Sequence, residues 1–488
     1  MEPAVPGAPL PFPAVDGALS VKVVYPPVRH VLTVRDSTFI FGSVGSGRAS
    51  LTINGAPVTV NPNGSFLAYL PVPRRDAPRY ELVAAKDGDT ARVSHEIAWP
   101  SAGNGAPAPQ LVVPATPKFV ELLNGNEDAK ADTDAVTILR PTQSGTYKWF
   151  LHPGTVVELT GERGAWSRVR LDAILEAWVE SKFTRPAART SAMVRTARNA
   201  RVTAAEGWSD LRIPLSERVP FLVEERMDAY VLTLYGTASD IDIVNLPTND
   251  VVIRDVTWEQ VATDRVRVTV HLRRAPYGYL ALWDRGAFLL RVRKPPVVAS
   301  RARPLEGRVI AVDAGHPPIG STGPTGLYEG DATLMVANAL KPLLEAAGAT
   351  VVMTRSTAGP VALGERPITA RHANADLFVS IHLNAHPDGV NPYRTNGSGT
   401  YYFHTRAEPL ARAVQRGLVR WMGLRDLGVN YDNLAVVRPT WFPAVLCEGA
   451  FVILPDQEAA LRTSDFQARY AMGILEGLEE YFRDLGTR

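Results

Sequence analysis

Three short apolar segments near the C-terminus, each running into polar residues, constrain the fold of this chain more than any other feature. They read VDAGH at residues 312–316, SIHLNA at residues 380–385 and LCEGAF at residues 446–451. Each lies in or directly after an apolar run with the length of a buried strand. Because amphipathic helical stretches separate these runs, the pattern predicts an α/β domain with a largely parallel sheet flanked by helices. We place this domain at residues 305–488.

The polar residues at these strand ends form a candidate reactive site. His316 follows the first strand, His382 and Glu448 end two others, and Glu329 enters at the start of the helical stretch after His316. Ligands of an open α/β sheet bind beyond the carboxyl ends of its strands, so we expect these side chains to meet at one edge. Two histidines and a carboxylate, with a second carboxylate nearby, are what a hydrolytic zinc site needs. The residue types therefore predict zinc-assisted amide hydrolysis without identifying the substrate.

A family resemblance covers residues 309–482. This segment resembles the zinc-dependent N-acetylmuramoyl-L-alanine amidases (amidase family 3 type), which cleave the stem peptides of peptidoglycan, in the order and spacing of a series of short motifs. The motifs are DAGH (313–316), GLYEGD (326–331), TR (354–355), LGER (363–366), ANADLF (373–378), SIHLNA (380–385), LAVVR (434–438) and PAVLCEG (443–449). The chain departs from the family at residues 317–318, where Pro-Pro replaces the usual Gly-Gly. It departs again at residues 449–451, where Gly-Ala-Phe replaces the usual Pro-Gly-Phe.

The resemblance implies a role for each candidate residue. His316, Glu329 and His382 would bind one Zn²⁺ ion, Glu448 would act as the general base, and Asn384 would bind substrate or orient a histidine. The implied reaction is hydrolysis of the amide bond between N-acetylmuramic acid and L-alanine, for cell-wall remodelling or daughter-cell separation. Two alternatives stay open: a non-catalytic envelope protein that binds peptidoglycan or a partner, and a zinc hydrolase that acts on another amide.

Other residues near these motifs are expected to have structural roles. His386 follows the second motif histidine by four residues, but an HExxH metal pair needs a helix and a glutamate, so we expect it to be exposed, with a place in the lining of the cleft as the alternative. His372 is expected to be structural, and Glu365 and Arg366 to cap and brace their own helix. The segment 388–397 is short and polar and has no helical pattern, so we predict that it forms no helix that would block the site.

The rest of the chain predicts three β modules in front of this domain. Residues 18–100 resemble a bacterial immunoglobulin-like (Ig-like) sandwich, and residues 118–186 resemble a bacterial Src-homology-3-like barrel. Residues 190–297 show the period-two alternation of half-buried strands and weakly resemble the β-rich N-terminal domain of cell-wall amidases. We interpret residues 1–17 as a flexible N-terminus and the Gly/Pro/Ala-rich residues 101–117 as a linker.

Local signals support these β modules. Two Asn-Gly pairs, at residues 54–55 and 63–64, predict hairpins with type I′ turns. Trp166 and Trp178 of the second module are interpreted as core residues, because aromatic side chains dominate the cores of small β domains. The alternative is that they bind a ligand such as cell-wall peptide.

Composition limits the class of protein further. The 488 residues carry a net charge of only +2 without a long basic run, so we expect no nucleic-acid partner. The single cysteine, Cys447, excludes an intramolecular disulfide and is expected to be buried in its strand rather than a nucleophile. No apolar run reaches 18 residues, so we expect no transmembrane segment, and the sequence as given starts without a signal peptide.

The same resemblance implies a location and partners. We expect an exported protein of the bacterial cell envelope, in the periplasm or cell wall, with peptidoglycan as its partner. The β modules are the expected contact surface for an activator or another envelope protein.

Overall fold

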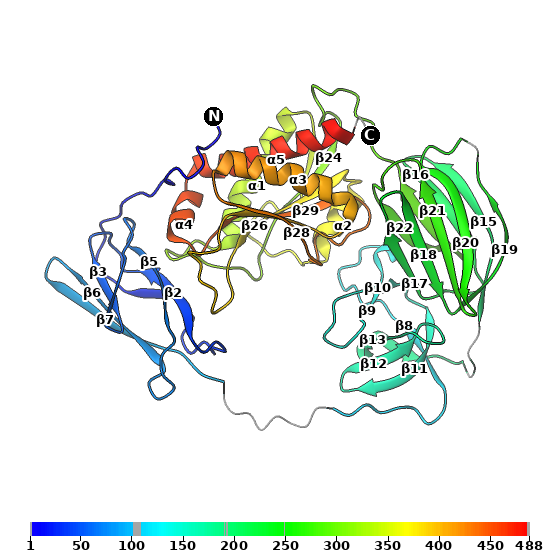
Figure 1. Ribbon diagram of the computed structural model, residues 1–488, viewed down its shortest axis with the longest axis horizontal. Coiled ribbons are helices and arrows are strands. Elements are labelled where there is room, and N and C mark those ends of the chain that lie inside the picture. Colours follow the sequence, from blue (N-terminus) through cyan, green and yellow to red (C-terminus); the bar gives the residue numbers. More distant parts are fainter. Residues whose placement is uncertain (1, 101–108, 190, 192–193, 248, 486–488) are drawn as a thin grey trace.

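The structure is a computed structural model that describes residues 2–100, 109–189, 191, 194–247 and 249–485. Figure 1 shows the C-terminal α/β domain in the middle, with an N-terminal β module on one side and two β modules on the other. Parts of the predicted segments 1–17, 101–117, 190–297 and 305–488 lie outside the described residues. Among the residues described, no helix has both the length and the apolar character needed to cross a membrane.

The N-terminal module is a sandwich of two antiparallel sheets. Its strands are β1 (Lys22–Tyr25), β2 (Ser37–Ser43), β3 (Ser50–Ile53), β4 (Ala56–Val58), β5 (Ser65–Pro71), β6 (Arg79–Lys86) and β7 (Asp89–Glu96). The sheets have the orders β1-β2-β5 and β4-β3-β6-β7. Asn54 and Gly55 both have positive φ, 51° and 79°, as a type I′ turn requires. At residues 63–64 only Gly64 does, with φ 80°, so the prediction of a type I′ turn there was wrong.

The second module is built of strands, with two short 3₁₀ helices at Asp132–Asp134 and Ser181–Phe183. Its strands are β8 (Lys118–Leu122), β9 (Thr137–Leu139), β10 (Trp149–Leu151), β11 (Val156–Arg163), β12 (Trp166–Arg170), β13 (Glu176–Glu180) and β14 (Thr184–Pro186). They form a sheet of order β13-β12-β11-β8-β14 and a pair β10-β9. Trp166 and Trp178 are only partly buried, and their rings face the guanidinium groups of Arg140 and Arg163 at 5.0 and 5.6 Å. The prediction that both are core residues was therefore wrong.

The third module packs two larger sheets face to face. Its strands are β15 (Arg195–Ala205), β16 (Trp208–Pro214), β17 (Phe221–Glu225), β18 (Ala229–Tyr235), β19 (Thr237–Asn245), β20 (Ile253–Ala262), β21 (Arg265–Leu272), β22 (Tyr279–Asp284) and β23 (Ala287–Arg293). The sheet orders are β19-β15-β16-β23-β22 and β17-β18-β21-β20. The predicted alternation is confirmed in β21, where every second residue is buried.

Within its described residues, the C-terminal domain combines one six-stranded sheet with five α-helices and one short 3₁₀ helix (Thr405–Ala407). The strands are β24 (Val309–Ala314), β25 (Thr350–Met353), β26 (Leu377–Asn384), β27 (Ser398–Tyr402), β28 (Asp426–Tyr431) and β29 (Ala444–Phe451). The helices are α1 (Glu329–Ala346), α2 (Glu365–His372), α3 (Glu408–Met422), α4 (Pro455–Leu461) and α5 (Ser464–Leu485). The sheet order is β25-β24-β26-β29-β27-β28. All pairs are parallel except β27 with β29, so the predicted largely parallel sheet is confirmed.

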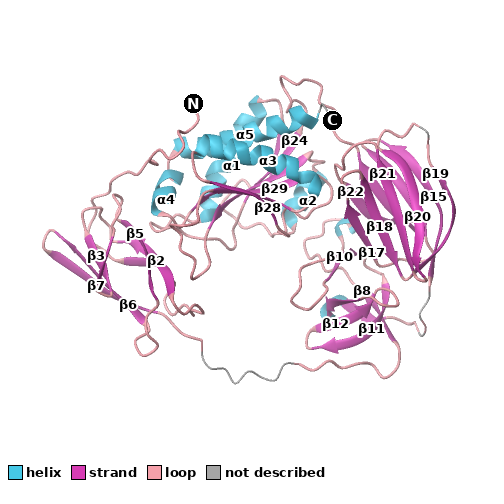
Figure 2. Ribbon diagram, in the orientation of Figure 1, coloured by secondary structure: helices cyan, strands magenta, loops and turns pink. Residues whose placement is uncertain are grey.

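The two faces of this sheet are covered unequally. Helices α1, α3 and α5 pack over one face, around buried residues such as Val379, Ile381 and Val445 (Figure 2). The other face carries α2 and the segment 434–442, which enclose a smaller cluster that includes Phe378 and Phe442. The carboxyl ends of the parallel strands therefore lie between a layer of three helices on one face and the smaller layer of α2 and residues 434–442 on the other.

All three β modules contact the C-terminal domain directly. Phe39 and Phe41 of the N-terminal sandwich belong to the same buried apolar cluster as the sheet and helices of the C-terminal domain. From the third module, Glu225 forms an ion pair with the buried Arg406, and the Tyr277 hydroxyl donates to the Asp376 carbonyl at 2.8 Å. The C-terminal domain is thus the part against which the other three are assembled.

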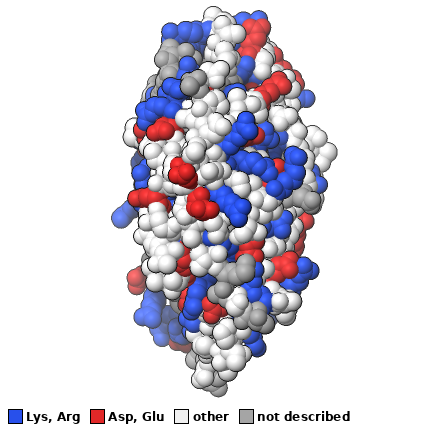
Figure 3. Space-filling model, turned by 90° about the vertical axis from the view of Figure 1, so that its right-hand side faces the viewer, with Lys and Arg blue, Asp and Glu red and all other residues white. Residues whose placement is uncertain are grey.

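The surface charge agrees with a small net charge. Figure 3 shows basic and acidic side chains interspersed over the face that it presents. The sequence as a whole carries 52 basic and 50 acidic residues. This mixture offers no broad surface of one sign on that face.

Candidate metal centre

His316 reaches the site through a glycine-dependent turn at the end of β24. A Cβ atom on Gly315 would lie 2.5 Å from the His382 ring, which is closer than any real Cβ contact. Only glycine therefore allows the backbone before His316 to pass so near the second histidine. His316 itself has φ 57°, in the left-handed region. The two imidazole rings lie 4.8 Å apart, centroid to centroid, at an interplanar angle of 79°.

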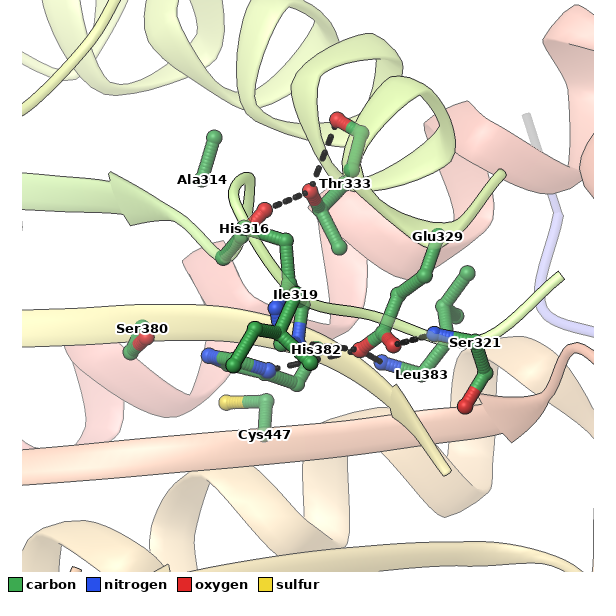
Figure 4. A network of polar contacts seen from close by, with 12 residues as sticks. Ala314, His316, Ile319, Ser321, Glu329, Thr333, Ser380, His382, Leu383 and Cys447 are labelled. Atoms are coloured by element: carbon green, nitrogen blue, oxygen red, sulfur yellow. Dashed lines mark hydrogen bonds and ion pairs between the residues drawn. The ribbon is translucent and has the colours of Figure 1, made fainter. Parts of the chain in front are cut away.

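Glu329, the first residue of α1, lies between the two histidines (Figure 4). Its Oε1 atom is 3.1 Å from His316 Nε2 and 3.3 Å from His382 Nδ1. The backbone N–H groups of Ser321 and Leu383 donate to the two carboxylate oxygens at 3.0 and 3.1 Å. Burial alone would raise the pKa of Glu329, but the hydrogen bonds from both histidines outweigh it and lower this pKa to about 2.

These three residues fit a zinc ion by donor type and spacing. His316, Glu329 and His382 each offer one ligand atom, and all three atoms lie within 4.8 Å of one another. Zinc ligands at about 2.0–2.2 Å on tetrahedral corners lie about 3.3 Å apart, close to the two donor separations observed here. Two imidazoles and one carboxylate form the donor set of a catalytic zinc site that keeps a fourth position open. The structure thus brings together all three residues that the sequence predicted as ligands.

Glu448 lies beside the metal centre without belonging to it. The register of β26 and β29 pairs it with His382, which places both side chains on the same face of the sheet. Glu448 is partly exposed, yet its Oε2 atom is enclosed and has no hydrogen-bond partner within the described residues. Burial raises the pKa of Glu448 well above its usual range, and the negative charge of Glu329 raises it further. A carboxylate in this position can exchange a proton with a molecule bound at the metal.

The remaining predicted residues divide between the site and its surroundings. Asn384 ends β26 two residues after His382 and therefore lies on the same face. Cys447 is fully buried, as predicted, and burial raises the pKa of its thiol. His386 is partly buried with its ring 4.6 Å from Phe451, so the prediction that it is exposed was wrong.

Three predictions concern α2 and the segment after β26. His372 contacts Asp134 of the second module at 3.0 Å, which is a structural role as predicted. Arg366 does not brace α2: its guanidinium points away to the loop that carries His316. Residues 388–397 contain turns and bends but no helix, so the predicted absence of a blocking helix is confirmed for these residues.

Sequence reasoning assigned no role to three buried charged residues near the site. Asp313 and Arg355 lie under the His316 loop, and Glu458 of α4 binds a more distant part of the same loop. Asp313 and Arg355 stand in the motifs DAGH and TR, which was the available signal. Glu458 stands in none of the motifs, and nothing in its local sequence distinguishes it from a helix-surface glutamate.

Comparison with known proteins finds relatives of the C-terminal domain. The family described as N-acetylmuramoyl-L-alanine amidase matches residues 310–480. The N-acetylmuramoyl-L-alanine amidase LytC of Bacillus subtilis is 35% identical over 37% of this chain and 36% of its own length. The uncharacterized protein YqiI of the same species is 33% identical over 38% of this chain and 89% of its own length. The probable cell wall amidase LytH of Staphylococcus epidermidis is 32% identical over 42% of this chain and 67% of its own length.

Solved structures cover the same part of the chain. The catalytic domain of CwlV, an N-acetylmuramoyl-L-alanine amidase from Bacillus (Paenibacillus) polymyxa var. colistinus, is 34% identical over 36% of this chain and 97% of its own, with a TM-score of 0.34. The region of this chain that corresponds to LytC spans only about a third of that relative's length. The N-terminal β modules lie outside the family match at residues 310–480.

Proposed function

This chain belongs to the N-acetylmuramoyl-L-alanine amidase family, and from that premise we propose how the whole protein acts. It hydrolyses the amide bond between N-acetylmuramic acid and L-alanine in peptidoglycan, with one Zn²⁺ ion. The observation that supports this most is that three possible metal donors lie close together near Glu448, whose Oε2 atom has no hydrogen-bond partner among the described residues. Buried polar atoms normally have a partner, so an enclosed oxygen without one suggests a group that waits for a ligand.

In this proposal each side chain has a separate task. His316, Glu329 and His382 hold the zinc ion. Zinc, when bound, polarises the amide carbonyl and lowers the pKa of a water molecule from about 15.7 towards 7. Glu448 takes the proton of the attacking water on a carboxylate oxygen and delivers it to the departing amine of L-alanine. Asn384, on the same face, binds the substrate.

The β modules and the location complete the proposal. We assign residues 18–100 to an Ig-like fold, residues 118–186 to a Src-homology-3-like fold and residues 190–297 to the β-rich type that precedes cell-wall amidases. The protein acts in the bacterial cell envelope, in cell-wall remodelling or daughter-cell separation, and its modules offer surfaces for an activator. The name of LytH, a probable cell wall amidase, supports this location.

Product analysis on purified peptidoglycan tests the reaction. The zinc-loaded protein is incubated with the polymer, with and without a chelator, and soluble products are identified by mass spectrometry. We expect chelator-sensitive release of free stem peptides that begin at L-alanine, without new reducing sugar ends. Binding to the polymer without release would instead support a non-catalytic envelope protein.

Replacing the proposed base tests the role of Glu448. Glu448→Gln keeps the size of the side chain but cannot accept the water proton, so turnover should fall by at least about 100-fold while zinc stays bound. The matched control is Glu345→Gln on the exposed side of α1, which should leave turnover unchanged. Near-normal turnover of Glu448→Gln would remove this residue from the mechanism.

A further inference from the structure

A buried polar network lies directly under the loop that carries His316. The Asp313 carboxylate is 0% exposed and accepts hydrogen bonds from Thr354 Oγ1 at 2.5 Å and from Ser380 Oγ at 2.6 Å. Its third donor is the guanidinium of Arg366 on α2, at 2.8 Å. A buried carboxylate with three donors resists displacement, because moving any partner would leave a buried charge uncompensated.

Arg366, held in place by Asp313, also binds the backbone of the loop. Its side chain is 3% exposed and donates to the carbonyl oxygens of Ala314 at 2.8 Å, His316 at 3.2 Å and Pro317 at 2.9 Å. A further bond of 3.1 Å reaches the carbonyl of Val361. A guanidinium has five N–H donors in one plane, so it can bind several acceptors whose relative positions are then set by its geometry. The backbone on both sides of the metal-binding histidine is held by one planar group.

A second arginine holds the beginning of this short segment. Arg355 donates through Nε to the Ala314 carbonyl at 2.8 Å and through a terminal nitrogen to the Gly315 carbonyl at 3.0 Å. The same nitrogen donates to the Gly330 carbonyl, next to the ligand Glu329. Arg355 therefore connects the histidine loop to the start of α1, whereas Arg366 alone contacts the backbone of His316 itself.

The conformation of His316 explains why such support is needed. Its φ of 57° is in the left-handed region, where the Cβ atom of a non-glycine residue crowds the backbone. A residue keeps such a conformation only when its surroundings determine it. Arg366 provides part of this support by donating hydrogen bonds to the carbonyl groups of His316 and Pro317.

The helix that carries Arg366 is itself held by the second β module. Asp134 accepts from Arg371 at 2.7 Å and from His372 at 3.0 Å, at the C-terminal end of α2. At the other end, Asp128 accepts from the backbone N–H of Gly364 at 3.1 Å. Both ends of α2 are therefore attached to a part of the chain more than 200 residues away in sequence.

We propose that Arg366 is a positioning residue that sets the backbone of His316 for metal binding, from a helix anchored by the second β module. This inference rests on the proposed role of His316 as a zinc ligand. Arg366 touches neither the substrate nor the metal, and its effect reaches the site through three carbonyl groups of the loop.

Zinc affinity and a cobalt spectrum test this proposal. Arg366→Lys keeps the charge but replaces the planar group by a single nitrogen that cannot bind the same set of carbonyls. We expect about 10- to 100-fold weaker zinc binding in a chelator competition, the usual range for residues that orient a metal ligand. We also expect a changed visible absorption spectrum of the Co²⁺-substituted protein, because the ligand geometry changes. The matched control is Arg412→Lys, which alters an exposed arginine–carboxylate pair on α3 and should change neither quantity.

Two further variants test the anchor of α2 and the metal site itself. Asp134→Asn weakens the anchor of α2 without touching the metal loop and should weaken zinc binding in the same direction, by about threefold. If Arg366→Lys does not fold, this variant decides: threefold weaker binding supports the proposal, and unchanged binding overturns it. Unchanged affinity and spectrum in folded Arg366→Lys would also overturn it, even if the zinc-free protein were less stable. His316→Ala is the reference: if the wild type binds zinc no better than His316→Ala, the proposed function has failed and not this inference.

Discussion

Two loops leave the metal centre from neighbouring strands, and they are held in different ways. The first loop, residues 315–328, follows β24, and the second loop, residues 385–397, follows β26. The first loop is held by buried charged residues of the C-terminal domain itself. The second loop is held largely by the N-terminal sandwich, which lies about 350 residues away in sequence. One side of the site is therefore bound directly by its own domain, with the second β module reaching it only through α2, and the other side is bound directly by the N-terminal sandwich.

The first loop is supported from below and from its far end. Arg366 and Arg355 bind its beginning, and Glu458 binds its end. The Glu458 carboxylate is fully buried and accepts from the backbone N–H groups of Thr325 and Leu327 and from the Thr325 hydroxyl, at 2.9 to 3.0 Å. These charge-assisted bonds leave the loop little freedom.

The second loop is bound to the sandwich mainly through Asp388. Its carboxylate accepts from the Tyr25 hydroxyl at 2.6 Å, interacts with His30 Nε2 at 2.9 Å and accepts a longer bond of 3.4 Å from Thr38. The hydroxyl of Tyr393 returns a bond of 2.6 Å to a backbone carbonyl in β5 of the sandwich. Apart from the buried Thr38, these side chains are partly buried or, for Tyr393, exposed, so we expect the second loop to open more easily than the first.

The largest effect in this comparison should come from the first loop. Glu458→Ala leaves three donors of that loop without their acceptor in a buried place, which should lower the free energy of unfolding by about 3–5 kcal/mol. Urea denaturation measures this loss. Glu345→Ala, an exposed glutamate on α1, should change stability by less than about 0.5 kcal/mol. A loss below about 1 kcal/mol for Glu458→Ala would show that the first loop is not held as tightly as its contacts suggest.

An intermediate effect is expected where the second loop meets the sandwich. Asp388→Ala removes the acceptor shared by three donors of the sandwich, so amide hydrogen exchange in residues 385–397 should become about 10- to 30-fold faster, equivalent to about 2 kcal/mol. Zinc affinity should change by less than about twofold, because the hydrogen bonds of Asp388 go to the sandwich and not to the three proposed metal ligands. Asp76→Ala, an exposed residue of the same sandwich, is the control. Unchanged exchange would mean that the apolar contacts of Phe39 and Phe41 hold this interface alone.

The smallest effect should follow from losing one hydrogen bond. Tyr393→Phe removes only the bond from its hydroxyl to the Leu67 carbonyl, which should cost about 1 kcal/mol and speed exchange in the second loop about fivefold. The double variant with Asp388→Ala completes a mutant cycle. Non-additive effects would show that both residues stabilise the same closed state of the loop. Strict additivity would separate them into independent contacts.

The sequence by itself predicted the candidate site residues and the sheet that carries them. His316, His382 and Glu448 follow apolar strands, and the parallel arrangement of those strands brings their ends to one edge, so the site could be predicted from local pattern. Glu329 follows from the same logic, because it begins the helix that returns from His316. Strand and helix periodicity are short-range properties, so they sufficed to bring these candidates to one edge; the role of each residue was implied only by the family resemblance.

Only the tertiary structure decided what holds those residues in place. Arg366 stands in a short helix, and the sequence suggested that it braces that helix; the direction of its long side chain decides otherwise. The pairing of Asp134 with α2 and of Asp388 with the N-terminal sandwich joins residues separated by more than 200 and 300 positions. Contacts over such separations form between the surfaces of folded domains, and a local pattern of charge or hydrophobicity does not predict which surfaces will pack together.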